Sequence, residues 1–73
     1  MDRVIGQRIR SVREQEDHTL VSLAKKTGLA FNTIAKHERG ETSLTVHRLI
    51  TIADALEWPI DYFIAGLSQE EQK

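Results

Sequence analysis

Two polar side chains in the stretch GLAFNTIAKHERGE, Asn32 and Lys36, stand four residues apart, which is the spacing of one helical turn. An asparagine amide can hydrogen-bond to both N6 and N7 of adenine, and a lysine ammonium can donate to O6 or N7 of guanine. Each such contact is worth about 1 to 3 kcal/mol of discrimination between bases. Each residue also has an ordinary interpretation, since Asn is common at exposed helix starts and Lys is commonly a solvated charge.

Phe31 stands directly before this pair and has no hydrogen bond to offer. Against a thymine methyl its ring gains apolar contact, which selects thymine by burial of surface. The alternative is a local cluster of Phe31 with Leu20, which would stabilise the surrounding structure and contact no base. The sequence leaves both interpretations open.

Apolar residues recurring every three or four positions predict that helices carry these side chains. No run of strand length alternates between apolar and polar residues. The sequence therefore predicts an all-α chain of five short helices. We expect them over about residues 3–16, from Thr19 to Gly28, over about 31–38, from Thr45 to Leu56, and from Pro59 to Gly66.

The ends of the predicted helices carry residues suited to capping. Asp2 can cap the first helix, and Asp17 can end it in a left-handed conformation that Asp tolerates. Thr19 and Thr45 are good N-caps for the second and fourth helices. Gly6 lies inside the first helix, where it costs helix propensity and so indicates a close approach by a neighbouring element.

Three residues constrain how the second and third helices meet. Two helices that cross steeply after a short connection need a small residue at the crossing, here Ala24. They also need a glycine that accepts positive φ, here Gly28, and an apolar residue that holds the later helix to the core, here Ile34. This spacing is the helix-turn-helix pattern.

The sequence resembles the Cro and phage-repressor class of helix-turn-helix domains, also called the xenobiotic-response-element (XRE) family. The resemblance covers about residues 5–64 and is carried by IGQRIRSVRE, TLVSLAKKTGLAFNTIAKHERGE and VHRLITIADALEWPIDYF. It implies a compact five-helix, lambda-repressor-like domain whose third helix lies in the DNA major groove. We expect this domain over residues 1–66, with the helix-turn-helix at about 20–38. A frayed tail is expected over residues 67–73, although Ser68 and Glu71 have the spacing of a capping box.

The resemblance also implies which residues meet DNA. Base-reading positions of the family fall at the start of the third helix and one turn later. Phosphate contacts fall at the start of the second helix and after the third. The family usually has glutamine where this chain has Leu20, so Leu20 and Phe31 together resemble an apolar replacement of a polar pair. The DNA-contacting residues expected here are Leu20, Ala30, Phe31, Asn32, Thr33, Lys36, Arg39, Thr42 and Ser43.

Arg13 and Glu38 match a family pair that forms a salt bridge between the first and third helices. We assign the pair to structure, since removing one partner from a buried pair strands the other charge at a cost of about 3 to 5 kcal/mol. The alternative is two unrelated surface charges. His18 and His37 are interpreted as amphipathic residues that fill partly buried positions.

Composition narrows the possible function classes. The chain has 73 residues, no cysteine and a net charge of −1, and no apolar run reaches membrane-spanning length. Residues 1–48 hold nine Lys and Arg against six Asp and Glu, whereas residues 49–73 hold one against five. We therefore expect a cytoplasmic protein whose basic surface lies in its N-terminal part. Neither metal ligation nor catalysis is expected, and no cofactor, because no cysteine assists a metal site and no nucleophile stands beside a base.

Apolar and aromatic residues crowd the C-terminal part of the chain. We expect Trp58 and Phe63 to close the core of the monomer. The remaining residues, Tyr62, Ile64 and Leu67, are expected to form a symmetric homodimer interface. A dimer would place two third helices about 34 Å apart and would require near-palindromic DNA.

Together these features predict a repressor-like transcriptional regulator that binds double-stranded operator DNA as a homodimer. The alternative is a protein-interaction module, of the antitoxin or adaptor kind, that keeps the fold without binding DNA. Leu20, Phe31 and the net charge favour the alternative, whereas Asn32, Lys36 and Arg39 favour DNA.

Overall fold

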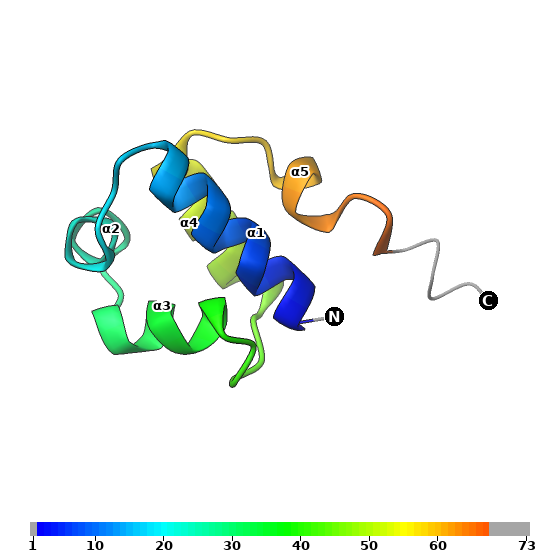
Figure 1. Cartoon of the computed structure of the whole chain (residues 1–73), viewed down its shortest axis with the longest axis horizontal. Coiled ribbons are helices and arrows are strands. Elements are labelled where there is room, and N and C mark those ends of the chain that lie inside the picture. Colours follow the sequence, from blue (N-terminus) through cyan, green and yellow to red (C-terminus); the bar gives the residue numbers. More distant parts are fainter. Residues whose placement is uncertain (1, 68–73) are drawn as a thin grey trace.

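The computed structural model describes residues 2–67, and every regular element in that range is a helix (Figure 1). The all-α, five-helix fold predicted from the sequence is therefore confirmed, with helix bounds within a few residues of those expected. The longest of the described helices has 14 residues, and none of them could span a bilayer. The five helices are α1 Asp2–Gln15, α2 Leu20–Thr27, α3 Phe31–Glu38, α4 Val46–Leu56 and α5 Ile60–Ile64.

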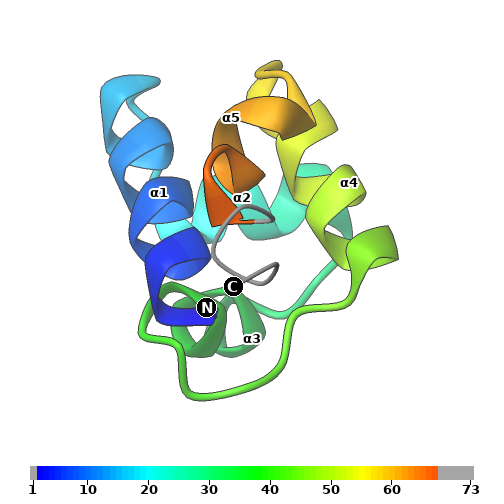
Figure 2. The same cartoon turned by 90° about the vertical axis from the view of Figure 1, so that its right-hand side faces the viewer.

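Helices α1 and α4 form the centre of the domain, and the other three pack around them. In Figure 1, α2 and α3 lie on one side of this central pair, and α5 lies on the other. Figure 2 shows the domain from the side of α5, with α1 and α4 flanking it and α3 below. This arrangement leaves one long side of α3 without a neighbouring helix.

The hydrophobic core takes one fully buried side chain from every helix. Because each helix is too short to be stable alone in water, packing of these side chains must hold all five in place. The side chains with no exposed surface are Ile9, Leu23, Ile34, Ile52 and Phe63.

Helix α4 buries a narrower stripe than the sequence predicted. The spacing of three and four residues predicts one shared core-facing side for Val46, Leu49, Ile50, Ala53 and Leu56. Val46 and Ile50 are instead 71% and 42% exposed. The buried stripe is formed by Leu49, Ile52, Ala53 and Leu56. At about 100° per residue, Val46 and Ile50 lie on the flank of that stripe, so their apolar side chains face outward.

The predicted caps of α2 and α4 are present. The hydroxyl of Thr19 accepts a hydrogen bond from the backbone N–H of Ser22 at 3.0 Å, and Thr45 accepts one from Arg48 at 3.1 Å. Asp17, after α1, has the expected left-handed conformation, with φ of 60°.

The prediction for Asp2 was wrong. Helix α1 already includes Asp2, so this residue lies in the first turn and not at the cap. Its carboxylate instead accepts a hydrogen bond from the backbone N–H of Leu44 at 3.5 Å. Asp2 therefore joins the start of α1 to the loop before α4, a long-range contact that local capping rules cannot predict.

Arg8 on α1 holds the end of α5. Its Nη1 atom donates to the backbone carbonyls of Phe63 at 3.2 Å and Ala65 at 2.9 Å, with a longer contact to Tyr62 at 3.4 Å. Carbonyls at a helix C-terminus lack partners within the helix and carry its negative dipole end, so a guanidinium suits them. This contact fixes α5 against α1.

The C-terminal boundary of the domain differs from the prediction in one residue that matters. Leu67 was assigned to a frayed tail and to a dimer interface, but it is only 6% exposed and belongs to the hydrophobic core. Both assignments were wrong, because the side chain of Leu67 packs into the core of the monomer. The rest of the predicted tail, 68–73, with Ser68 and Glu71, lies outside the described residues.

Candidate nucleic-acid interface

The connection between α2 and α3 is short and held by hydrogen bonds. Gly28 adopts φ of 78°, and its N–H donates to the carbonyl of Ala24 at 2.9 Å. A Cβ at Gly28 would meet nothing within 4 Å, so the residue is glycine for its backbone conformation and not for space. The next N–H, of Leu29, donates to the hydroxyl of Thr27 at 3.2 Å. The turn therefore fixes the angle at which α3 leaves α2.

The inward side of α3 is buried against α1 and the core. Ile34, His37 and Glu38 are 0%, 1% and 7% exposed. Gly6 of α1 meets the end of α3 so closely that a Cβ there would lie 2.1 Å from the carbonyl oxygen of His37. The sequence predicted a close approach at Gly6, and the approaching element is the backbone of α3.

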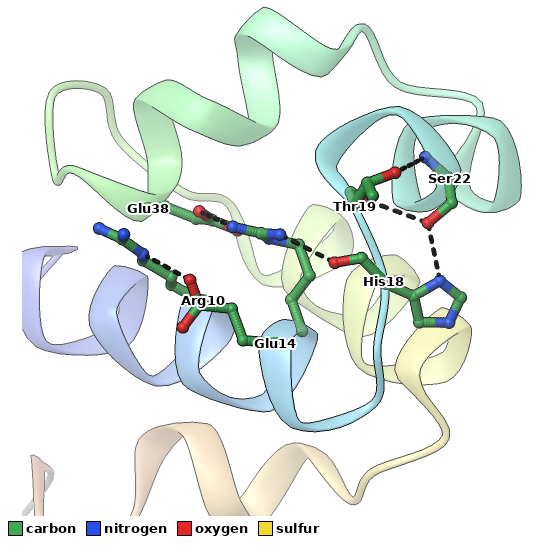
Figure 3. A network of polar contacts seen from close by, with 7 residues as sticks. Arg10, Glu14, His18, Thr19, Ser22 and Glu38 are labelled. Carbon is green, nitrogen blue, oxygen red and sulfur yellow. Dashed lines mark hydrogen bonds and ion pairs between the residues drawn. The ribbon is translucent and has the colours of Figure 1, made fainter.

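A bidentate ion pair joins α1 to α3 and is present as the resemblance implied. The Nε and Nη2 atoms of Arg13 donate to the two carboxylate oxygens of Glu38 at 2.6 and 3.2 Å. The remaining nitrogen, Nη1, donates to the carbonyl of His18 at 2.8 Å (Figure 3). The hydrogen bond to Glu38 raises the pKa of Arg13 above its usual value. Both side chains of this pair are largely buried and come from different helices, so the pair fixes α3 against α1.

His37 is more completely buried than the sequence indicated. Its Nε2 lies 3.3 Å from Nη1 of Arg48 on α4. Because arginine only donates, Nε2 must accept, and the neutral ring then carries its proton on Nδ1. That Nδ1 has no hydrogen-bond partner among the described residues. Burial lowers the pKa of His37 below 6.5, and the charge of Arg48 lowers it further.

The outward side of α3 exposes the residues predicted to read bases. Asn32 and Lys36 are both exposed, one turn apart, and Phe31 at the start of the helix is 49% exposed. Ala30 is the N-cap residue and Thr33 is half-buried. The structure therefore gathers the five predicted base-reading positions, residues 30–33 and 36, at the start and along one side of α3.

Leu20, the first residue of α2, differs from the others in this set. It is half-buried and packs against the core, whereas Phe31 stays largely exposed. A leucine has no polar atom in its side chain, so any contact of this position with phosphate must come from its backbone. The coupled replacement of a polar pair by Leu20 and Phe31 stays a prediction.

The loop between α3 and α4 contains the predicted phosphate contacts. Ser43 and Arg39 are exposed, and Thr42 is half-buried. Arg39 already has a partner, because its Nε and Nη2 atoms donate to the carboxylate of Glu41 at 2.8 and 3.2 Å. No role for Glu41 was predicted from the sequence, although an acid two residues after the arginine and across a glycine was a visible sign.

Within residues 2–67 the surface has no detected pocket, and no three side chains of metal-binding type cluster together. The candidate site is thus an exposed helix surface with an adjoining loop. Its shape suits a groove of a nucleic acid, into which a helix of this diameter fits.

These features define a class of protein: a helix-turn-helix domain of the lambda-repressor type. In such a domain the inward side of α3 packs on the core, and its outward side is exposed to solvent. The chain belongs to the HTH_3 helix-turn-helix family, which matches residues 9–63.

Several known proteins are similar to this chain over most of its length. A transcriptional regulator from the ATPase CF(0) region of Rhodospirillum rubrum is 37% identical over 73 residues, which cover all of this chain and 68% of that protein. The CTXphi transcriptional repressor RstR of Vibrio cholerae is 30% identical, with 94% of this chain and 62% of that protein covered. For an HTH-type regulator of Rickettsia prowazekii the covered share of the relative is 53%. The chain thus spans about half to two thirds of these relatives.

Solved structures share the fold. The restriction-modification controller protein C.AhdI of Aeromonas hydrophila superposes with a TM-score of 0.82 at 24% identity, covering 85% of this chain and 94% of that one. An HTH_3 family transcriptional regulator from Vibrio cholerae superposes with a TM-score of 0.83 at 29% identity, covering 94% of this chain and 39% of that one. The chain is therefore a transcriptional-regulator domain with a helix-turn-helix DNA-binding fold.

Proposed function

We propose that this protein is a repressor-like regulator that occupies near-palindromic operator DNA as a homodimer, with α3 of each copy in the major groove. The observation that carries the proposal is the exposure of Asn32 and Lys36 on the side of α3 opposite the buried Ile34. These two side chains have the donors and acceptors needed to read adenine and guanine. The Arg13–Glu38 pair and the Gly6 contact hold the helix that carries them.

Contacts to the DNA backbone come, in this proposal, from the loop after α3. Arg39, Thr42 and Ser43 follow the base-reading residues directly and supply one cation and two hydroxyls. Few cations are available in one copy, so a dimer that doubles the phosphate contacts would bind with a steep salt dependence. A flat dependence of the logarithm of affinity on the logarithm of salt concentration would contradict this part of the proposal.

The dimer interface is proposed to lie on α5. Tyr62 and Ile64 are each 41% exposed, so two large apolar side chains of this short helix remain accessible. Tyr62 packs edge-on against Trp58, with ring centroids 4.9 Å apart, so its position is fixed. A symmetric contact of α5 with a second copy would cover both side chains and place the two α3 helices about one DNA turn, 34 Å, apart.

The experiment that tests the proposal is selection of bound duplexes from a random pool, with sedimentation of the free protein alongside. Enrichment of near-palindromic sequences together with a dimer in solution is the expected result. A sharper version repeats the selection with Phe31→Ala. A loss of preference for thymine at one position would support a contact of the Phe31 ring with a thymine methyl, and an unchanged preference would remove that contact from the proposal.

A protein-interaction module is the second candidate function. The observation that favours it is the half-exposed ring of Phe31, together with an apolar Val21 on α2 that is 52% exposed, on a chain of net charge −1. Such a surface can bind an apolar partner instead of DNA. Absence of any enriched duplex at low salt, together with binding of a protein partner that Phe31→Ala abolishes, would support this candidate over the first.

A further inference from the structure

The end of α3 carries an exposed ion pair inside the proposed DNA-binding surface. Arg39 donates from Nε to one carboxylate oxygen of Glu41 at 2.8 Å and from Nη2 to the other at 3.2 Å. This two-point geometry is also the one by which an arginine holds a phosphate. The face of the Arg39 guanidinium best suited to the DNA backbone is therefore occupied by a carboxylate from the same chain.

The backbone around Gly40 places this carboxylate. Gly40 adopts φ of 72°, and a Cβ at this position would lie 2.8 Å from the Cα of Arg3 on α1. The N–H of Glu41 donates to the carbonyl of Lys36 at 2.9 Å. Both contacts fix the turn that brings Glu41 back toward the end of α3, so the fold places the backbone of Glu41 within reach of the Arg39 guanidinium.

Glu41 also lies within the field of a second cation in the site. The hydrogen bond from Arg39 lowers the pKa of Glu41, and the charges of Arg39 and Lys36 lower it further. The carboxylate therefore stays ionised at neutral pH, next to two of the side chains proposed to contact DNA. An approaching phosphate meets this negative charge.

We propose that Glu41 limits the DNA affinity of this domain by competing with a backbone phosphate for the Arg39 guanidinium. The inference rests on the proposed function. As long as the pair persists, Arg39 and Glu41 together carry no net charge, and Arg39 adds nothing to the number of counterions that binding releases from DNA. A regulator with such a built-in competitor binds all sequences more weakly, which favours release from non-specific DNA.

The test is a salt series with the substitution Glu41→Gln. A labelled random-sequence duplex serves as the probe, because the effect acts through phosphate and does not require the operator. We expect Glu41→Gln to bind more tightly and its salt slope to steepen by about 0.9 for each copy bound. The gain in affinity should consequently be about 3.5-fold larger per copy at 50 mM salt than at 200 mM, as that slope requires.

Two further variants separate competition for Arg39 from a general effect of charge. In an Arg39→Gln background, Glu41→Gln should lose most of its gain, because the cation that it frees is absent. Glu14→Gln is the charge-matched control: Glu14 pairs with Arg10 on α1 at 3.2 Å and has a side-chain exposure of 54%, close to the 52% of Glu41. It removes the same charge from a residue outside the proposed DNA-contacting set and should leave the salt slope unchanged.

The outcomes distinguish this inference from the proposed function. If the wild-type protein binds the duplex and Glu41→Gln changes neither affinity nor slope, the inference fails and the proposed function stands. A gain that persists in the Arg39→Gln background also overturns the inference, because it reflects general repulsion. Failure of every variant to bind at 50 mM salt overturns both, whereas binding by Glu41→Gln alone supports both.

Discussion

The two sides of α3 are built from neighbouring residues but differ in almost every physical respect. On the inward side, Ile34, His37 and Glu38 are buried and contact α1, α4 or the core. On the outward side, Asn32 and Lys36 contact no other helix through any hydrogen bond or ion pair of the described residues. Packing and pairing within the fold account for the burial of the inward residues, whereas nothing in the fold requires the identities of the outward ones. That explanation must come from what the outward side binds.

The largest effect is expected from a substitution that disrupts the Arg13–Glu38 ion pair on the inward side of α3. Glu38→Gln leaves the Arg13 guanidinium enclosed with a neutral partner, so the free energy of unfolding should fall by up to about 3 to 5 kcal/mol. For a domain of this size that is most of its stability. Urea unfolding followed by circular dichroism measures the change.

The control for this prediction replaces both charges with apolar residues. Arg13→Met combined with Glu38→Leu removes the stranded charge, so the double variant should be more stable than Glu38→Gln alone. A loss of less than about 1 kcal/mol in Glu38→Gln would show that the pair acts as an exposed salt bridge does.

The next effect concerns the contact between the backbones of α1 and α3. Gly6→Ala puts a Cβ where the His37 carbonyl lies, and neither backbone can yield without displacing a helix. We expect a loss of about 1 to 3 kcal/mol, even though alanine has the higher helix propensity. Thermal unfolding measures it, and Gln7→Ala on the exposed side of α1 is the matched control. Equal stability of the two variants would contradict the close contact.

On the outward side the prediction is the reverse: binding changes and stability does not. Asn32→Ala and Lys36→Ala should each reduce discrimination between bases by about 1 to 3 kcal/mol in competition binding to the selected operator. Their melting temperatures should match that of the parent protein, because both side chains are exposed. Lys25→Ala, at the exposed end of α2, removes a cation outside the site and should not alter sequence preference.

The smallest effect is a dependence of stability on pH that originates on the inward side. The pKa of His37 is lowered in the folded chain by burial and by Arg48, with partial compensation first from the backbone of Thr42 and then from Asp2. The unfolded chain therefore takes up the proton first, and stability is complete above about pH 6.5 and declines as the pH falls below it.

Melting temperatures between pH 8 and pH 5 measure this effect. In His37→Gln the decline should become shallower, because the titrating ring is gone. The variant His47→Gln, at an exposed position, should keep the decline of the parent. A parent protein that becomes more stable on acidification would contradict the sign of the His37 contribution.

Local patterns in the sequence were sufficient for the helices and for the motif. Threonine caps, apolar spacing and Gly28 predicted α3 at the bounds observed, 31–38. Errors arose where a side chain depends on distant parts of the chain. Leu67 lies beyond α5 and is nevertheless buried in the core, whereas Val46 lies on α4 and is 71% exposed.

The same limit applies to the candidate site. The resemblance selected Asn32, Lys36 and Arg39, and the structure gathers their positions on one surface. The resemblance could not show that Arg39 is already paired with Glu41, since this pairing depends on the turn at Gly40 and its packing on Arg3. Contacts of this kind follow from three-dimensional packing, which no pattern of a few adjacent letters specifies.

The contact at Gly6 also restricts how this chain can evolve. Every amino acid other than glycine carries a Cβ, so each missense change at codon 6 meets the carbonyl oxygen of His37. In a library of all single substitutions, position 6 should therefore be depleted in every variant. Position 32, exposed on the other helix of this contact, should tolerate nearly all of them under selection for folding alone. The absence of a Cβ at position 6 of α1 thus holds α3 in place while the outward side of α3 is free to diversify.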